Sequence, residues 1–291
     1  MKNPLFTGVC TALVTPFLNG EVNYPMLERL IARQLEGGVH AIVLCGTTGE
    51  APTLTDEEKR DIIARAKQVT GDDCLIIAGT GSNDTSHAVR LSRQAQEAGA
   101  DAVLVVSPYY NKATPEGLCL HYQAVALSVQ LPVIVYNVPS RTGVDIPVSV
   151  YRELSAMPNI AGVKEATGDM KKILSIRAQC PAHFRVWSGC DELTVPTLAL
   201  GGAGVISVLS NLYPEMTQTM VSAGLDGDFD TAADLQIRFE PIIRALFSQP
   251  NPIPVKAAMK LLGFDCGEPR LPLTPASHQL AEKLGTLLNI V

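Results

Sequence analysis

Short apolar runs alternate with amphipathic segments along most of the chain. Each run is rich in β-branched residues and is followed by a loop of Gly, Pro, Ser or Thr, then by apolar residues at helical spacing. The runs predict eight strands, at Gly8–Val14, Ala41–Cys45, Leu75–Ala78, Ala102–Val106, Val133–Tyr136, Gly162–Lys164, Arg185–Ser188 and Gly204–Ser207. The segments after them predict helices over 24–36, 56–69, 84–98, 115–129, 147–155, 169–179, 191–199 and 211–223.

Regular alternation of strands and helices gives a parallel sheet, and eight units fit a closed (β/α)8 barrel, the TIM barrel. An open, doubly wound sheet is the alternative. It is disfavoured because no Gly-x-Gly-x-x-Gly follows the first strand, and Gly46–Gly49 is too short for that motif. Helix-start signals agree with the barrel: Thr55–Glu58 has the spacing of a capping box, and Pro115 and Pro147 suit a first helical turn.

The pattern changes after Gly224, where no further β-rich run occurs. Three helices are predicted there, over 228–248, 253–263 and 275–289. We therefore expect an α/β chain in two parts, a (β/α)8 barrel over 1–224 and a C-terminal helical extension over 225–291. Three helices of this size bury little core alone, so the extension is expected to pack on the barrel.

Composition and charge narrow the function classes. Of 291 residues, 46% are hydrophobic and 18% are charged, which is typical of a globular protein. The net charge of −6 and the absence of a basic patch speak against nucleic acid as a partner. No segment resembles a membrane span or a signal peptide, so a cytoplasmic location is expected. The seven cysteines include no Cys-x-x-Cys pair and predict buried free thiols, not disulfides or a zinc site.

Lys164 is the most informative residue, because it ends the apolar run Ile160–Val163 and so lies at the mouth of the predicted barrel. Keeping a lysine neutral at pH 7, against an ordinary pKa of about 10.4, requires about 4–5 kcal/mol from its surroundings. A neutral amine there is a nucleophile for a carbonyl carbon and a candidate for Schiff-base formation. Alternatively, the side chain extends past the strand end into solvent. This segment alone favours neither interpretation.

Active sites of such barrels lie at the carboxyl ends of the strands. The groups at these ends are hydroxyls, phenols, one guanidinium and glycine-rich turns, in Gly46–Glu50, Ser107–Asn111, Tyr136–Gly143, Lys164–Glu165, Ser188–Asp191 and Ile206–Ser207. No cluster of His or carboxylates suits a metal, so neither a metal nor a cofactor is expected. Singly, Thr47 and Thr48 are explained as a turn, Tyr136 as a strand former, Arg141 as a surface residue and Asp191 as a helix start. Together they favour Schiff-base chemistry with hydroxyls that move protons.

Three motifs resemble the signatures of a known family. Gly46–Glu50, Tyr136–Pro139 and Gly162–Glu165 resemble those of the class I pyruvate-dependent lyases and synthases, which include dihydrodipicolinate synthase and N-acetylneuraminate lyase. The resemblance extends over essentially the whole chain, Asn251–Lys256 included. Ser140–Gly143 is similar to the synthase branch, because relatives that cleave sialic or other keto acids usually lack an arginine here. The resemblance implies a lyase that condenses pyruvate with L-aspartate 4-semialdehyde, the first committed step of lysine and diaminopimelate biosynthesis.

The resemblance also implies catalytic roles for individual residues. Lys164 is expected to form the imine with pyruvate. Tyr136 is expected to relay protons together with Thr48 and with Tyr110, which reaches in from a neighbouring subunit. The resemblance further implies a homotetramer built as a dimer of dimers, or a dimer, in the cytoplasm of a bacterium.

Substrate-binding roles follow from the same resemblance. Thr47 and Thr48 are expected to hold the pyruvate carboxylate, and Arg141 the carboxylate of the semialdehyde. The carbonyl of Gly189 and the side chain of Ile206 are expected to complete the pocket.

One set of positions departs from the family pattern. In lysine-inhibited relatives the product binds at the tight-dimer interface, at positions that correspond to Ala51, Pro52, Asp56, Lys59, Asn83, His87 and Tyr109. Inhibited members of the common bacterial type have histidines in place of Asp56 and Lys59 and a glutamate in place of His87. Losing that anion and gaining the cation of Lys59 opposes a cationic ligand, whereas Asn83 and Tyr109 are retained. We therefore expect weak inhibition by lysine or none.

Two alternative functions stay open. The chain could be another Schiff-base lyase, which splits a sialic or sugar keto acid, or a barrel that binds a keto acid as a sensor without catalysis. Arg141 argues against the first, because a polyol substrate gains little from a cation. Lys164, Tyr136, Thr48 and Tyr110 together argue against the second, because a binding module does not need a proton relay.

Overall fold

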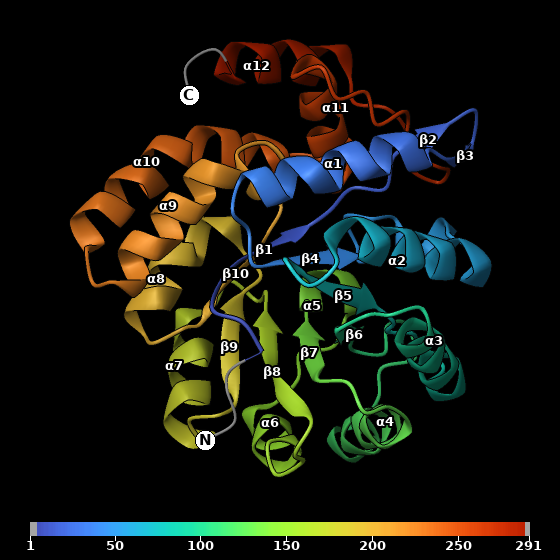
Figure 1. Cartoon of the computed structure of the whole chain (residues 1–291). Coiled ribbons are helices and arrows are strands. Elements are labelled where there is room, and N and C mark those ends of the chain that lie inside the picture. Colours follow the sequence, from blue (N-terminus) through green and yellow to red (C-terminus); the bar gives the residue numbers. More distant parts are fainter. Residues whose placement is uncertain (1–4, 289–291) are drawn as a thin grey trace.

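A computed structural model describes residues 5–288 of the chain. Eight parallel strands close into a barrel in the order β1-β10-β9-β8-β7-β6-β5-β4 (Figure 1). The strands are β1 Gly8–Ala12, β4 Ala41–Leu44, β5 Leu75–Gly79, β6 Ala102–Val106, β7 Val133–Asn137, β8 Ile160–Glu165, β9 Arg185–Ser188 and β10 Gly204–Ser207. Helices cover the outside and side chains fill the inside, which is why these strands are apolar on both faces. The predicted fold class is confirmed.

Helices connect the strands and surround the barrel (Figure 1). They are α1 Tyr24–Glu36, α2 Asp56–Thr70, α3 Thr85–Glu97, α4 Pro115–Ser128, α6 Val148–Leu154, α7 Met170–Gln179, α8 Thr194–Ala199 and α9 Pro214–Leu225. The capping box of Thr55 and Glu58 is present at the start of α2, and Pro115 begins α4 as predicted. Pro147, by contrast, precedes the first turn of α6, because its backbone is still extended with ψ 149°.

Several short elements escaped the sequence pattern. A hairpin of β2 Phe17–Leu18 and β3 Glu21–Val22 follows β1, and the one-turn helix α5 Pro139–Thr142 follows β7. Short 3₁₀ turns also occur, namely η1 Ala51–Thr53 before α2, η2 Asp191–Leu193 before α8 and η3 Leu209–Asn211 before α9. The helices predicted over 191–199 and 211–223 therefore each begin with a separate turn. Elements of two to four residues are too short to show a hydrophobic period.

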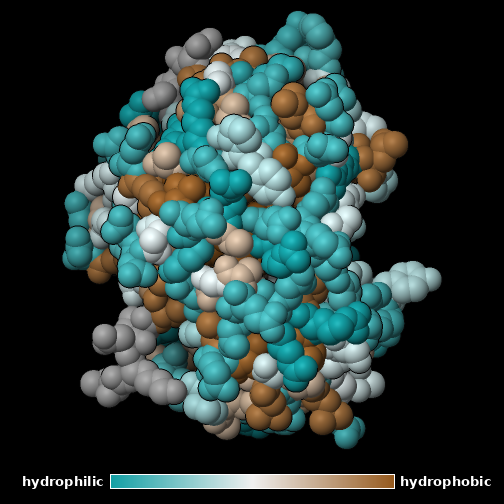
Figure 2. All heavy atoms as spheres, turned by 45° about the vertical axis from the view of Figure 1, so that its right-hand side comes forward, coloured by the Kyte–Doolittle hydropathy of each residue, from teal (hydrophilic) through white to brown (hydrophobic). Residues whose placement is uncertain are grey.

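Two buried apolar clusters hold the barrel together. The larger one lies between the strands and the surrounding helices, and the smaller one fills the barrel interior. In the interior the ring of Trp187 stacks on Phe6, with 4.9 Å between ring centroids. The surface face in Figure 2 is mostly hydrophilic, and its hydrophobic residues form small separate groups. Because the interior is packed, the barrel has room for a ligand at its mouth and not at its centre.

The C-terminal helices lie against the barrel. They are α10 Phe229–Leu246, α11 Ile253–Leu261 and α12 His278–Leu288. The helix predicted over 275–289 thus starts later, and residue 289 lies outside the described residues. Helix α10 contacts α8 and α9, and its buried side chains join the larger core cluster. The division between 1–224 and 225–291 stays a prediction; α9 ends at Leu225.

No helix in the described range 5–288 is long and apolar enough to cross a membrane. The seven cysteines are all free, and five of them are buried, as the sequence predicted.

Candidate active site

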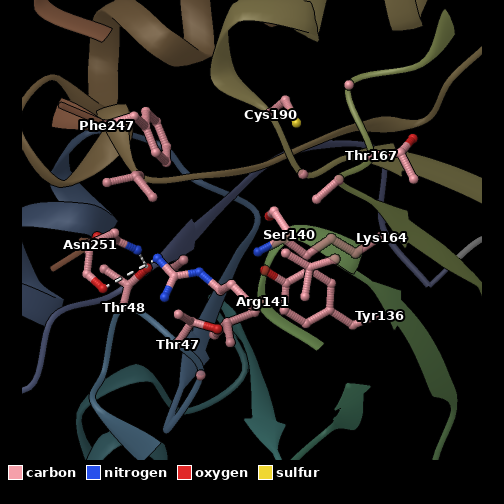
Figure 3. A pocket seen from close by; sticks show the side chains of 18 of the residues that line it. Thr47, Thr48, Tyr136, Ser140, Arg141, Lys164, Thr167, Cys190, Phe247 and Asn251 are labelled. Carbon is pink, nitrogen blue, oxygen red and sulfur yellow. Dashed lines mark hydrogen bonds between the residues drawn. The ribbon is translucent and has the colours of Figure 1, made fainter. Parts of the chain in front are cut away.

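A cavity of about 310 Å³ opens at the carboxyl ends of the barrel strands (Figure 3). Most of the predicted chemical groups line it. The polar residues around it include Thr47, Thr48, Tyr136, Ser140, Arg141, Lys164, Thr167, Glu192 and Asn251, and the backbone of Gly189 borders it. Residues at the strand ends, which are far apart in the sequence, therefore lie around one cavity.

Lys164 points into this cavity and does not extend into solvent. Its residue is 6% exposed, and its Nζ lies 4.5 Å from the centroid of the Tyr136 ring. The closeness follows from strand register, because Tyr136 on β7 is the direct partner of Lys164 on β8. Directly opposed residues on neighbouring strands place their side chains on the same face. Within the described residues, the Lys164 amine has no hydrogen bond and no ion pair.

Glu165, the next residue on β8, points to the opposite side of the strand, as alternation requires. Its carboxylate accepts hydrogen bonds from Asn137 Nδ2 at 3.0 Å, Tyr151 Oη at 3.1 Å and the Thr167 backbone N–H at 3.0 Å. Burial raises the pKa of the Glu165 carboxyl, whereas the charge of Lys172 lowers it. These bonds anchor the end of β8 from behind and so hold Lys164 in place.

The backbone of Gly189 leaves the lysine room to move. A Cβ atom at this position would lie 2.7 Å from Ala166 Cβ and 3.2 Å from Lys164 Cε. Cys190 follows it at the cavity wall, where burial raises the pKa of its thiol to about 12. Ile206 lies in the apolar barrel interior and is not among the cavity-lining residues.

The turn with Thr47 and Thr48 is held by residues from elsewhere in the chain. Asn251 Nδ2 donates a hydrogen bond of 2.9 Å to Thr48 Oγ1, and Arg141 Nη2 donates one of 3.4 Å to the Asn251 carbonyl (Figure 3). Asn251 comes from the loop between α10 and α11, within the C-terminal extension. The sequence alone predicted no role for it. An asparagine between two prolines, Pro250 and Pro252, was the available signal.

Tyr110 lies away from the cavity of its own chain. It is 89% exposed, and its backbone has a φ of 72°. A positive φ in a bulky residue is uncommon and marks a constrained turn. The predicted role of Tyr110 in a neighbouring subunit stays a prediction.

A second cavity, of about 450 Å³, adjoins the first. It contains most positions of the predicted lysine site, namely Ala51, Pro52, Asp56, Lys59, His87 and Tyr109. Asn83 is not among its lining residues; its carbonyl accepts a hydrogen bond of 2.9 Å from Asn111 Nδ2.

The carboxylate of Asp56 in this second cavity already has two polar partners. His87 Nε2 lies 3.1 Å from Asp56 Oδ2, and Lys59 Nζ lies 3.8 Å from Asp56 Oδ1. Thr47, Tyr136 and Arg141 line both cavities, so the two share a wall.

No group of three or more potential metal ligands occurs within residues 5–288. The site instead offers one buried amine on the sixth barrel strand, a phenol beside it, hydroxyls and a guanidinium. On a (β/α)8 barrel, this combination defines a lyase of the class I type, which forms a Schiff base with its substrate.

Comparison with known proteins gives the particular family. The chain belongs to the Dihydrodipicolinate synthetase family, which it matches over residues 5–291. It is 46% identical to the 4-hydroxy-tetrahydrodipicolinate synthase of Acetivibrio thermocellus, over 99% of this chain and 98% of that one. It is 48% identical to the enzyme of the same name from Lachnoclostridium phytofermentans, over 93% and 92% of the two chains.

A solved structure agrees with these relatives. The chloride-inhibited dihydrodipicolinate synthase of Acinetobacter baumannii, complexed with pyruvate, has a TM-score of 0.96 and 40% identity and covers 98% of each chain. These matches support the synthase prediction and not the alternative keto-acid lyase.

Proposed function

We propose that this chain condenses pyruvate with L-aspartate 4-semialdehyde to give 4-hydroxy-tetrahydrodipicolinate. The observation that supports this most strongly is the buried Lys164 amine, unpaired within the described residues and 4.5 Å from the Tyr136 ring. Arg141 in the same cavity supports a carboxylated aldehyde as the second substrate, because a guanidinium binds a carboxylate through two parallel hydrogen bonds.

The first half of the reaction activates pyruvate. The Lys164 amine adds to the ketone carbon, and loss of water leaves a protonated imine. Thr47 and Thr48 hold the pyruvate carboxylate through hydroxyl and backbone N–H groups. Tyr136 removes a proton from the methyl carbon, and the electron pair moves towards the imine nitrogen to give an enamine.

The second half forms the new carbon–carbon bond. The enamine carbon attacks the aldehyde carbon while Arg141 holds the carboxylate of the semialdehyde, and the relay protonates the new alkoxide. The substrate's own amine then adds to the imine carbon and displaces Lys164. Ring closure therefore regenerates the free enzyme without a further reagent.

The same proposal includes an assembly and a location. Tyr110 of the partner subunit completes the relay of Tyr136 and Thr48, which requires a dimer or a tetramer of two dimers. The exposed position of Tyr110 supports this, because a phenol on the surface is available to a second copy of the chain. The substrates are soluble metabolites, so we place the enzyme in the cytoplasm.

The test is a condensation assay with both substrates, coupled to a reductase and followed by NADPH oxidation. Turnover supports the proposal. If borohydride traps pyruvate on Lys164 but no turnover occurs, the chain is a Schiff-base enzyme for pyruvate, and its second substrate is not L-aspartate 4-semialdehyde. Arg141→Ala separates these cases further, because it should raise the KM for the semialdehyde while leaving pyruvate trapping intact.

A further inference from the structure

Asn251 has an unusual environment for an amide side chain. The residue is 6% exposed, and its Nδ2 donates to Thr48 Oγ1 at 2.9 Å. Its Oδ1 is buried and has no hydrogen-bond partner within the described residues. A buried unpaired acceptor is unfavourable, so a side chain kept in this state needs an explanation. The one polar contact of the amide is with a hydroxyl of the proposed proton relay (Figure 3).

This contact determines what the Thr48 hydroxyl can do. A threonine hydroxyl has one hydrogen to donate and two lone pairs that accept. Because the Asn251 amide occupies a lone pair of Oγ1, the Thr48 hydrogen is left to point elsewhere. Tyr136 and Lys164 line the same cavity. The Asn251 amide therefore favours the orientation in which the Thr48 hydroxyl donates its hydrogen towards the cavity. Donation back into the loop is disfavoured.

The loop around Asn251 is fixed to the threonine turn at a second point. Five residues further on, Lys256 on α11 is 3% exposed, and its Nζ lies 2.6 Å from Glu50 Oε1. Glu50 ends the turn that contains Thr48, with a left-handed backbone of φ 57°. A buried ion pair adds little net stability, but its geometry fixes which segments meet. The pair therefore sets the distance over which the Asn251 amide reaches Thr48.

We propose that Asn251 is a positioning residue of the proton relay, which orients the Thr48 hydroxyl by donating a hydrogen bond to it. The C-terminal extension thus has a function beyond covering the barrel. This inference rests on the proposed function, because it assumes that Thr48 moves protons.

The decisive variant is Asn251→Asp, which replaces a donor by an acceptor of nearly the same shape. An ionised carboxylate would accept the Thr48 hydrogen and remove it from the relay, so kcat at pH 8 should fall about tenfold or more. Protonation restores a donor. The ratio of variant to wild-type kcat should therefore rise as the pH is lowered, by up to roughly tenfold per pH unit. The final amount of pyruvate that borohydride traps on Lys164 should be the same in the variant and the wild type.

Gln249→Glu is the matched control, because it makes the same amide-to-carboxylate change two residues away. Its kcat ratio should stay constant with pH. A flat ratio for Asn251→Asp, in protein that melts like the wild type, would overturn the proposal. A wild type without turnover would instead overturn the function on which it rests.

A double-mutant cycle covers the case in which Asn251→Asp does not fold. If Asn251 acts only through Thr48, the kcat losses of Asn251→Ala and Thr48→Val should not add, and the double variant should resemble Thr48→Val alone. Fully additive losses would show that Asn251 acts independently of Thr48, which contradicts the proposal.

Discussion

Two buried lysines, Lys164 and Lys256, lie in the same part of the molecule but in opposite electrostatic surroundings. Both are less than a tenth exposed, and each lies within 5 Å of an aromatic ring centroid, 4.5 Å for Lys164 and 4.3 Å for Lys256. Lys256 has the carboxylate of Glu50 at 2.6 Å, whereas Lys164 has no ion pair within the described residues. The difference is the presence of an anion and not the degree of burial.

This comparison explains which lysine is suited to react. Burial lowers the pKa of Lys256, and the Glu50 carboxylate opposes that shift by favouring the charged ammonium. The Lys256 amine is held by the Glu50 carboxylate and is therefore not free to add to a carbonyl carbon. A third buried lysine, Lys172, is likewise paired, with Asp145. Lys164 faces a cavity in place of a carboxylate, so its amine is available to a carbonyl carbon.

The largest expected effect comes from removing the unpaired lysine. Lys164→Ala should lower kcat by ~10⁴-fold or more, because the covalent step has no other amine in the cavity. Mass spectrometry after borohydride treatment with pyruvate should find an adduct on Lys164 in the wild type and none in the variant. The exposed Lys260→Ala should leave both intact. A pyruvate adduct on Lys256 in either protein would refute the comparison.

Replacing the paired lysine, Lys256, should instead lower the free energy of unfolding. Lys256→Met leaves the Glu50 carboxylate buried without its cation, and we expect a loss of about 3–5 kcal/mol in the free energy of unfolding. The double variant Glu50→Gln/Lys256→Met should recover most of this, because the amide still accepts from the Arg270 backbone N–H. Urea unfolding measures the free energy of unfolding of both variants.

The matched control for this pair is Lys260→Met, on the same helix. Lys260 lies 3.3 Å from Asp265, and both side chains are mostly exposed. Exposed pairs contribute little, so the change should stay within about 0.5 kcal/mol. Equal stability of Lys256→Met and its double variant would show that the pair is not coupled.

His121 extends the comparison to a buried base for which burial outweighs the charge of the nearby Asp84. Burial lowers the pKa of the His121 imidazole to about 4. The folded state therefore binds fewer protons than the unfolded state between about pH 4 and pH 6.5, and stability falls as the pH is lowered through this range. From pH 7 to pH 5 the loss due to His121 should be about 2 kcal/mol.

Unfolding of His121→Gln at the two pH values checks this. The variant keeps a polar side chain to bond Thr85 Oγ1, which lies 2.9 Å from His121 Nδ1, but it cannot titrate. Its pH-dependent loss should be smaller by the same amount. His278→Gln, with an exposed imidazole, should behave like the wild type. An unchanged loss in His121→Gln would mean that another group titrates.

The comparison also shows how far sequence reasoning extends. Lys164 was found because an apolar run that ends in lysine is a local pattern, and regular strand–helix alternation placed it at a barrel mouth. The pairing of Lys256 with Glu50 was not found, because the two residues are 206 positions apart and share no local pattern. The contact of Asn251 with Thr48 escaped for the same reason, with a separation of 203 positions.

The smallest expected effect concerns free lysine, which brings a cation and needs an unpaired carboxylate to bind. Asp56 is the only carboxylate among the described residues that line the second cavity, and it already has an ion pair with Lys59 and a hydrogen-bond contact with His87. We therefore expect lysine to leave the rate of the coupled assay nearly unchanged. The double variant Lys59→His/His87→Glu removes the cation and adds an anion, and lysine should inhibit it. The reductase alone, titrated with lysine, is the control. A sub-millimolar inhibition constant for the unmodified protein would show that pairing does not block the site.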